Sequence, residues 1–172
     1  MFFINTGVVV MAALGTEVHM PRLAAARIGS DAWLLLGKLH ASGSALNNRA
    51  LAGYGLRERS FSILALACSG LEPTQRELAN FLSFDPSQVA TLVDDLERRG
   101  LVERAQGDQD RRARIIVSTA EGRKMHAKAR AALDAAELDQ FAALSGEESL
   151  ELSRLLRKAL WGEAEQPLEA VV

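Results

Sequence analysis

The chain has 172 residues, about the length of one typical domain, with 20 Lys and Arg against 22 Asp and Glu. Its 48% of hydrophobic residues and its single cysteine argue against a disordered polyelectrolyte, a collagen-like chain or a disulfide-rich scaffold. The net charge of −2 argues against a general polycation, so nucleic-acid binding would need a local arginine cluster. Nothing in the composition points to an oxidising compartment, and we expect a cytoplasmic protein.

The two ends of the chain carry no helical pattern. Residues 1–14 are apolar, but they are too short to span a bilayer and lack the Lys or Arg that begins a secretory signal. We interpret residues 1–29 as a flexible N-terminal extension with Met11 or Met20 as the natural start, and a weak membrane or partner anchor is the alternative. Residues 162–172 are expected to form a flexible tail.

Two helices are predicted after this extension. Asp31 can begin a long helix that runs to about Leu51, and Gly53 and Gly55 end it. A second helix follows from about Arg57 to Cys68, with apolar residues on one face. Neither segment carries the alternating pattern of a strand.

Two shorter helices are predicted next from their starting residues. Thr74 and Glu77 have the spacing of a capping box, which predicts a short helix over Gln75–Phe81. Asp85 can accept hydrogen bonds from free backbone N–H groups, and a proline suits the first helical position. We therefore expect a further helix over Pro86–Arg99.

The apolar residues of this helix fix which side of it faces outward. They recur at the spacing of one helical face and are Val89, Leu92, Val93 and Leu96. The opposite direction holds Ser87, Thr91, Asp94 and Arg98, with Gln88 beside them. A helix in the major groove of DNA reads bases mainly with its N-terminal residues, and Ser, Gln and Thr can hydrogen-bond base edges. A solvated polar face on an ordinary helix is the alternative.

A β-hairpin is predicted after this helix. Residues 101–104 and 114–118 are short apolar or β-branched runs that flank a turn-rich polar stretch. The tip of the hairpin holds Asp110, Arg111, Arg112 and Arg114. These arginines have no packing role, and a narrow minor groove attracts inserted arginine. Asp110 can hold Arg112 through a charge-assisted contact. An exposed loop with salt bridges of little value is the alternative.

Two helices are predicted at the C-terminal end. Thr119 begins a long helix that runs to about Leu144, and Ser145 with Glu148 forms a second capping box that opens a last helix to about Trp161. The single short sheet needs helices to cover it. The order of elements therefore predicts a mainly α fold, a winged helix-turn-helix with a small β-hairpin wing between long flanking helices.

Three stretches of this chain resemble the winged-helix regulators of the MarR family. They are residues 74–82, 85–104 and 108–124, within a region of similarity from 56 to 125. The Asp-x-Arg pattern of the family's wing falls on Asp110 and Arg112. With the flanking helices included, the resemblance covers about residues 30–161.

The resemblance implies a homodimeric transcription regulator, often a repressor, bound to a pseudo-palindromic double-stranded DNA operator. Helices within 30–55 and 119–161 would intertwine as dimerisation helices, and residues 56–118 would form the DNA-binding domain. The implied DNA contacts are Ser87, Gln88, Thr91 and Arg98 of the recognition helix and Asp110, Arg111, Arg112 and Arg114 of the wing. In such proteins a small ligand or an oxidised cysteine commonly releases the DNA.

The chain also departs from the family pattern. Family members often have Arg where this chain has Thr91, and a basic or neutral residue where it has Asp95. Residues 71–118 contain seven Arg and nine Asp and Glu, a net charge of −2. We therefore expect DNA contacts to depend heavily on the wing arginines. A winged-helix module that docks a partner protein without DNA readout is the alternative.

Apolar residues on the flanking helices suggest two further surfaces. The candidate dimer interface consists of Trp33, Leu152, Leu155, Leu156, Leu160 and Trp161. A candidate effector pocket consists of Trp33, His40, Tyr54 and Phe61, and the alternative is that these residues belong to the core or the dimer face.

We find no sequence support for catalysis, and we expect a protein that is not an enzyme. No nucleophile with a base, phosphate loop or dinucleotide fingerprint occurs in the sequence, so no catalytic residue or cofactor is predicted. His19, His40 and His126 have no metal-binding spacing, so no metal is predicted. We interpret Cys68 as a small core residue, and an oxidant sensor is the alternative.

Overall fold

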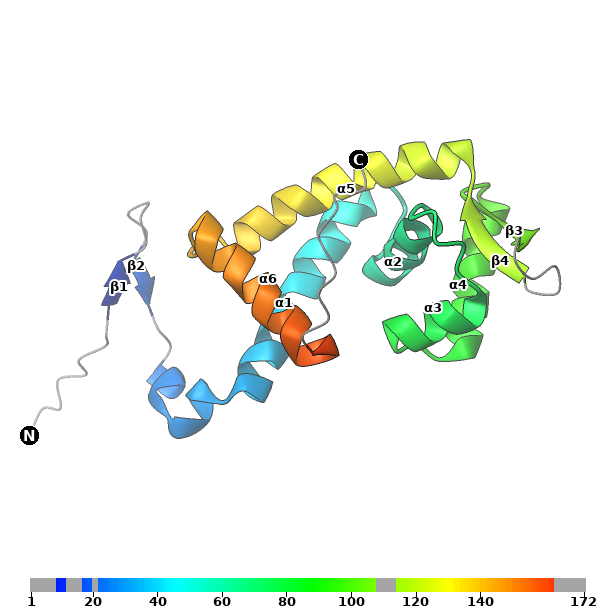
Figure 1. Ribbon diagram of the computed structural model, residues 1–172. Helices are drawn as coiled ribbons and strands as arrows, with labels where there is room; N and C mark the ends of the chain where they lie inside the picture. The colour runs from blue at the N-terminus through cyan, green and yellow to red at the C-terminus, as the bar shows by residue number, and fades with distance from the viewer. Residues whose placement is uncertain (1–8, 12–16, 20–21, 108–113, 163–172) are drawn as a thin grey trace, which may run out of the picture. The chain divides into compact units, whose positions relative to one another are not determined.

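The computed structural model describes residues 9–11, 17–19, 22–107 and 114–162 (Figure 1). The chain divides into two compact units. Within the described ranges, the first unit comprises the residues up to 43 and those from 138 onward, and the second comprises residues 44–137. Mainly helical structure with one hairpin among the later helices confirms the predicted winged-helix class.

A second small sheet precedes the helices. Strands β1 (Val9–Met11) and β2 (Glu17–His19) pair antiparallel, and two short 3₁₀ helices follow, η1 (Arg22–Ala25) and η2 (Arg27–Ser30). The prediction of a single sheet was therefore wrong. The missed signal is a run of three valines at positions 8–10, because β-branched residues favour strands.

The first unit contains the start of helix α1 (Ala32–Ala52), the end of helix α5 (Ala120–Gln140) and helix α6 (Gly146–Trp161). Helix α5 ends four residues before the predicted Leu144. At this point Gln140 Nε2 donates to the Leu39 carbonyl at 3.0 Å, and a Cβ on Gly43 would lie 2.6 Å from the Gln140 side chain. With glycine at position 43, the Gln140 side chain can lie against α1 without moving.

Helix α6 begins at the predicted capping box. Glu148 N donates to Ser145 Oγ at 3.2 Å, and Ser145 N donates back to Glu148 Oε2 at 2.7 Å. These hydrogen bonds hold the pKa of Glu148 below its usual value. No residue of α6 is buried in the chain as described, although its sequence has an apolar stripe.

The second unit holds the hydrophobic core. It is built from helices α2 (Glu58–Ala67), α3 (Gln75–Leu82) and α4 (Pro86–Arg98), strands β3 (Val102–Gln106) and β4 (Arg114–Ser118), and the middle of α5. Figure 1 shows α3 and α4 beside the hairpin. The largest fully buried side chains are Leu51, Leu56, Ile63, Leu64, Leu78, Leu96, Ile116, Val89, Val93 and Val102.

Local chemistry starts and stops these helices as predicted. Thr74 Oγ1 accepts from Glu77 N at 3.2 Å at the start of α3, and Asp85 Oδ1 accepts from Ser87 N at 2.8 Å at the start of α4. Gly100 follows α4 with a φ of +68°, which a glycine adopts without strain.

The base of the hairpin is fastened to the first turn of α5. Thr119 N donates to the Leu101 carbonyl at 3.1 Å, and Thr119 Oγ1 donates to the Gly100 carbonyl at 2.6 Å. Thr119 Oγ1 also accepts from Gly122 N at 2.9 Å, so this residue caps α5. A Cβ on Gly122 would lie 1.9 Å from the Leu101 carbonyl oxygen. Only glycine allows this contact between helix and strand.

We expect Gly122→Ala to lower the free energy of unfolding by about 1–3 kcal/mol, because the new methyl group collides with backbone. This figure is the net loss, because the collision outweighs the gain of about 1 kcal/mol that alanine brings to a helix interior. Urea unfolding followed by circular dichroism measures it. Gly146→Ala is the matched control, because it lies in the first turn of α6 with nothing within 4 Å of its Cβ position. Equal stability of both variants would contradict the packing account.

Candidate nucleic-acid interface

Burial of one face of α4 exposes the opposite face as a polar ridge. Val89, Val93 and Leu96 are completely buried. We define the α4 ridge as the residues that face the other way, which are Ser87, Gln88, Thr91, Asp94 and Arg98. Gln88 is half-buried and the other four are exposed. The structure thus brings together on one surface the residues that the sequence pattern grouped.

Hydrogen bonds within the protein already hold the N-terminal part of this ridge. Ser87 Oγ donates to Asp85 Oδ1, and Thr91 Oγ1 donates to the Ser87 carbonyl at 3.0 Å. The hydrogen bonds from the Ser87 side chain and backbone lower the pKa of Asp85, so this carboxylate stays ionised as the N-cap of α4. The hydroxyl groups of Ser87 and Thr91 therefore both donate their hydrogen bond to another group of the protein.

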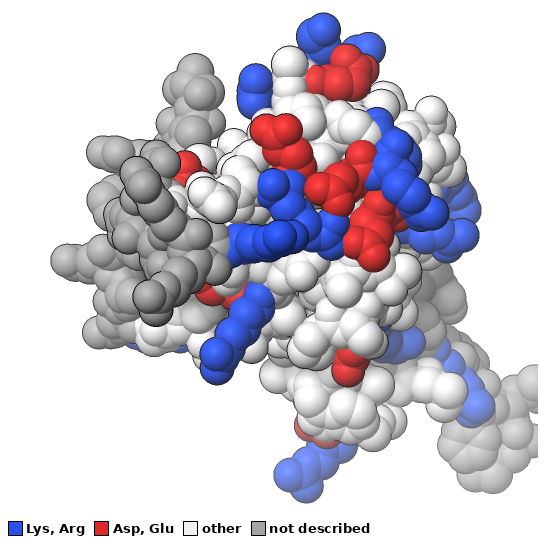
Figure 2. Space-filling view, turned by 90° about the vertical axis from the view of Figure 1, so that its right-hand side faces the viewer, with Lys and Arg blue, Asp and Glu red and all other residues white. Residues whose placement is uncertain are grey.

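Carboxylates partner the basic residues on this side of the molecule. Arg104 of β3 pairs with Asp94 and Glu97, and Arg98 Nη2 lies 2.9 Å from Asp95 Oδ1. Figure 2 shows acidic and basic side chains interleaved over the side on which α4 and the hairpin lie. The exposed pair of Arg98 contributes little stability, and Arg104 is half-buried, but both sets of pairs reduce the positive charge that this surface offers to a polyanion.

The wing is described only at its base. Asp110, Arg111 and Arg112 lie outside the described residues, so their assignment to DNA stays a prediction. Arg114 is exposed at the first position of β4, where it pairs in register with Gln106. In the register of β3 and β4, the pair Gln106 and Arg114 lies at the end of the described ladder that is away from Thr119.

Arg59 is an interface residue that the sequence analysis missed. Its Nη1 donates to Gln88 Oε1 at 2.7 Å, and its guanidinium carbon lies 5.0 Å from the centre of the Phe84 ring. Arg59 belongs to α2, Phe84 to the turn before α4, and Gln88 to α4. No local pattern signals this contact, because it exists only once α2 and α4 are packed together.

The four candidate effector residues lie in different surroundings. Trp33 and His40 are exposed on α1 in the first unit. Tyr54 is partly buried against the core of the second unit, and Phe61 is only 5% exposed there. The Phe61 ring stacks on His126 with centroids 5.4 Å apart. Phe61 thus has a core partner, and the effector pocket stays a prediction.

Cys68 lies at the end of α2, partly buried against the core. Burial raises the pKa of its thiol, and a hydrogen bond with Ser118 and the charge of Arg123 lower it by less. A raised pKa leaves little of the reactive thiolate. This environment favours the packing role over the oxidant sensor.

The described part of the chain lacks two further kinds of site. Among these residues, no group of three or more His, Cys, Asp or Glu could hold a metal ion. None of the helices in the described ranges is long and apolar enough to cross a membrane.

Comparison with known proteins relates this chain to DNA-binding regulators. The model of the MarR family matches residues 56–113. CouR of Rhodococcus jostii RHA1, solved bound to p-coumaroyl-CoA, is 36% identical with a TM-score of 0.72, over 78% of this chain and 94% of that one. A MarR-family transcriptional regulator of Rhodococcus sp. RHA1 is also 36% identical with a TM-score of 0.72, over 78% of this chain and 96% of that one.

A more distant structure includes nucleic acid. A MarR family protein of Mycobacterium tuberculosis, solved in complex with DNA, is 26% identical with a TM-score of 0.63, over 76% of this chain and 98% of that one. No curated protein matches the sequence. The relationship to known proteins therefore rests on the family model and the solved structures.

The stacked His126 predicts how stability varies with pH. Burial and the positive charge of Arg130 lower the pKa of His126 below its ordinary value of 6.5. Below about pH 6.5 His126 binds a proton more readily in the unfolded chain than in the folded chain, so the free energy of unfolding falls as the pH drops. Above that pH His126 is neutral in both states and this loss of stability is absent. Urea unfolding between pH 5 and 8 should show this loss, and His126→Phe should remove it. His40→Gln is the exposed control and should behave as wild type, and the same pH dependence in all three proteins would contradict the assignment.

Proposed function

Because the chain belongs to the MarR family of DNA-binding transcriptional regulators, we propose that it acts as a homodimeric repressor on a pseudo-palindromic operator. The observation that carries the proposal is the exposed α4 ridge beside the base of a hairpin. A helix presents its N-terminal side chains to the bases of the major groove, and a basic wing reaches the neighbouring minor groove. The relative solved in complex with DNA supports DNA binding by this chain.

The dimer part of the proposal rests on apolar surface in the first unit. Trp33, Leu155, Leu160 and Trp161 are 66%, 49%, 70% and 56% exposed. Leu152 and Leu156 are half-buried. Large exposed apolar side chains are a signal of an interaction site, and a second copy of the chain is the partner that the family membership suggests.

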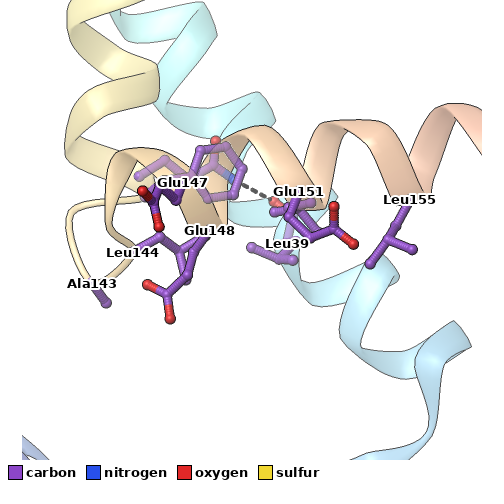
Figure 3. Close-up of a pocket in the computed structure, with 10 residues that line it drawn as sticks. Leu39, Ala143, Leu144, Glu147, Glu148, Glu151 and Leu155 are labelled. Carbon is purple, nitrogen blue, oxygen red and sulfur yellow. Dashed lines mark hydrogen bonds between the residues drawn. The ribbon is translucent and has the colours of Figure 1, made fainter.

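A hollow of about 620 Å³ adds to this surface. Figure 3 shows its walls, which come from α1, the turn after α5 and α6. Leu39, Leu144 and Leu155 give it an apolar lining, and Glu147 and Glu151 stand at its edge. All of these residues belong to the first unit. In the proposed dimer the partner's apolar side chains would fill this space.

Release of DNA by a small molecule completes the proposed function. Two recognition helices must lie about one helical turn of DNA apart, ~34 Å, to enter successive major grooves. A ligand that prefers a dimer with a different distance between its recognition helices lowers DNA affinity. The loss can be no larger than the difference between the ligand's binding free energies for the two dimer states. The Rhodococcus relative bound to p-coumaroyl-CoA makes an aromatic acyl thioester the first effector to test. Such a regulator works in the cytoplasm and needs no catalytic group.

The wing supplies the first test. We expect Arg112→Ala to weaken binding to a genomic operator fragment by about tenfold to a hundredfold, measured by fluorescence anisotropy. Lys128→Ala, on the exposed side of α5, is the charge-matched control and should bind as wild type. Unchanged affinity of Arg112→Ala would remove the wing from the mechanism. Wild-type binding should also fall steeply with salt, and binding insensitive to salt would favour the docking of a partner protein.

The dimer interface supplies the second test. We expect Leu160→Asp to convert a particle of twice the 18.6 kDa chain mass into a monomer, measured by sedimentation equilibrium, because a buried carboxylate is costly. Leu71→Asp is the control, since Leu71 is 79% exposed in the other unit. A folded Leu160→Asp protein that remains dimeric would place the interface elsewhere.

A further inference from the structure

We propose that Arg59 determines base specificity by fixing the orientation of the Gln88 side-chain amide. With the amide oxygen held by Arg59, Gln88 presents its NH₂ group to DNA. It should therefore select a base with a keto oxygen in the major groove, guanine or thymine, over adenine and cytosine. This inference rests on the proposed function and adds a residue outside the recognition helix to it.

The orientation of the amide follows from the chemistry of its partner. An arginine side chain has five N–H donors and no acceptor, so the Gln88 atom that faces it is the carbonyl oxygen. The distance of 2.7 Å from Arg59 Nη1 to Gln88 Oε1 is that of a charge-assisted hydrogen bond. Turning the amide over would bring two N–H groups together. The bond thus selects one of the two orientations.

Arg59 is itself held in place by contacts on its other side. Its guanidinium carbon lies 5.0 Å from the centre of the Phe84 ring, which is a cation–π distance. Phe84 packs against the hydrophobic core. The neighbouring carboxylate of Glu58 accepts from Ser44 and Asn47 and is directed toward α1. Arg59 is exposed, and this ring contact together with the bond to Gln88 favours the position of its guanidinium beside Gln88.

The NH₂ group of Gln88 is open to a ligand. Within the described part of the chain, Gln75 Nε2 is the one buried side-chain nitrogen or oxygen without a hydrogen-bond partner. Gln88 is only half-buried and lies in the first turn of α4, where recognition helices meet base edges, so its NH₂ group is placed to reach a base.

The committed oxygen changes what this residue can read. A free glutamine pairs with adenine by donating to N7 and accepting from the N6 amine. Gln88 keeps the donor, but Arg59 takes one of the two lone pairs of its oxygen and fixes the direction of the other, which disfavours bidentate pairing with N7 and the N6 amine of adenine. Guanine offers O6 and N7 and thymine offers O4, and all three are acceptors. The expected preference is therefore for keto bases at one position of each half-site.

The neighbouring ridge residues have the opposite polarity. The hydroxyl protons of Ser87 and Thr91 are donated to Asp85 and to the Ser87 carbonyl. Their oxygens are left with lone pairs that can accept from base amines. The start of α4 thus presents a donor at Gln88 between acceptors at Ser87 and Thr91. The protein's own hydrogen bonds set this order before any DNA is bound.

The experiment is selection from a randomised double-stranded DNA library by the full-length protein, followed by sequencing. Gln88→Ala identifies the base position that Gln88 reads, since preference there is lost. At that position wild type should select guanine or thymine. Arg59→Met keeps an unbranched side chain beside Phe84 but has no donor, and it should reduce the ratio of keto bases to adenine about tenfold there, with other positions unchanged. Arg59→Lys restores a donor and should restore much of the preference.

Two further variants make the result decisive. Gln88→Glu keeps the contact with Arg59 but has no donor, so its preference should move to adenine or cytosine. If Arg59→Met does not fold, the base preference of Gln88→Glu tests the proposal. Arg76→Met, on the exposed surface of α3, is the matched control and should select as wild type.

The outcomes separate the inference from the proposed function. If Arg59→Met lowers affinity equally for all sequences and keeps the keto preference, Arg59 is a phosphate contact and the inference is wrong. A wild-type preference for adenine or cytosine at the Gln88 position would also overturn it. If wild type selects no sequence at all, the proposed operator binding fails and this inference fails with it.

Discussion

The burial of one face of α4 is the constraint on which the candidate interface depends. Val89, Val93 and Leu96 are completely buried, and turning the helix about its axis would expose at least one of them to water. The hydrophobic effect thus decides which side chains form the exposed α4 ridge. Truncating one of these residues would harm the interface indirectly, because the orientation of the ridge is determined by its opposite side.

The charges on this surface limit how strongly it can attract a polyanion. Asp94 and Glu97 hold Arg104, and Asp95 holds Arg98, so these arginines meet carboxylates before they meet phosphate. The general electrostatic part of DNA binding is reduced in proportion.

Sequence reasoning found the elements whose signals are local. Thr74 with Glu77, Asp85 with Pro86, and Ser145 with Glu148 marked helix starts because the caps join residues a few positions apart. The position of the α4 ridge followed from helical periodicity alone. The end of α5 was misplaced because the contact of Gln140 with Leu39 joins residues about a hundred positions apart. The contact of Arg59 with Gln88 was missed for the same reason, since only the packed fold brings α2 against α4.

The exposure of helix α6 affects how stable the helix is. None of its 16 residues is buried within the chain as described, and a helix of this length is only marginally stable by itself in water. In the proposed dimer its order comes from the other copy and obeys mass action. Dilution would then fray this helix as it separates the copies. The abundance of the protein in a cell would set both the number of occupied operators and the fraction of each chain that resists proteolysis.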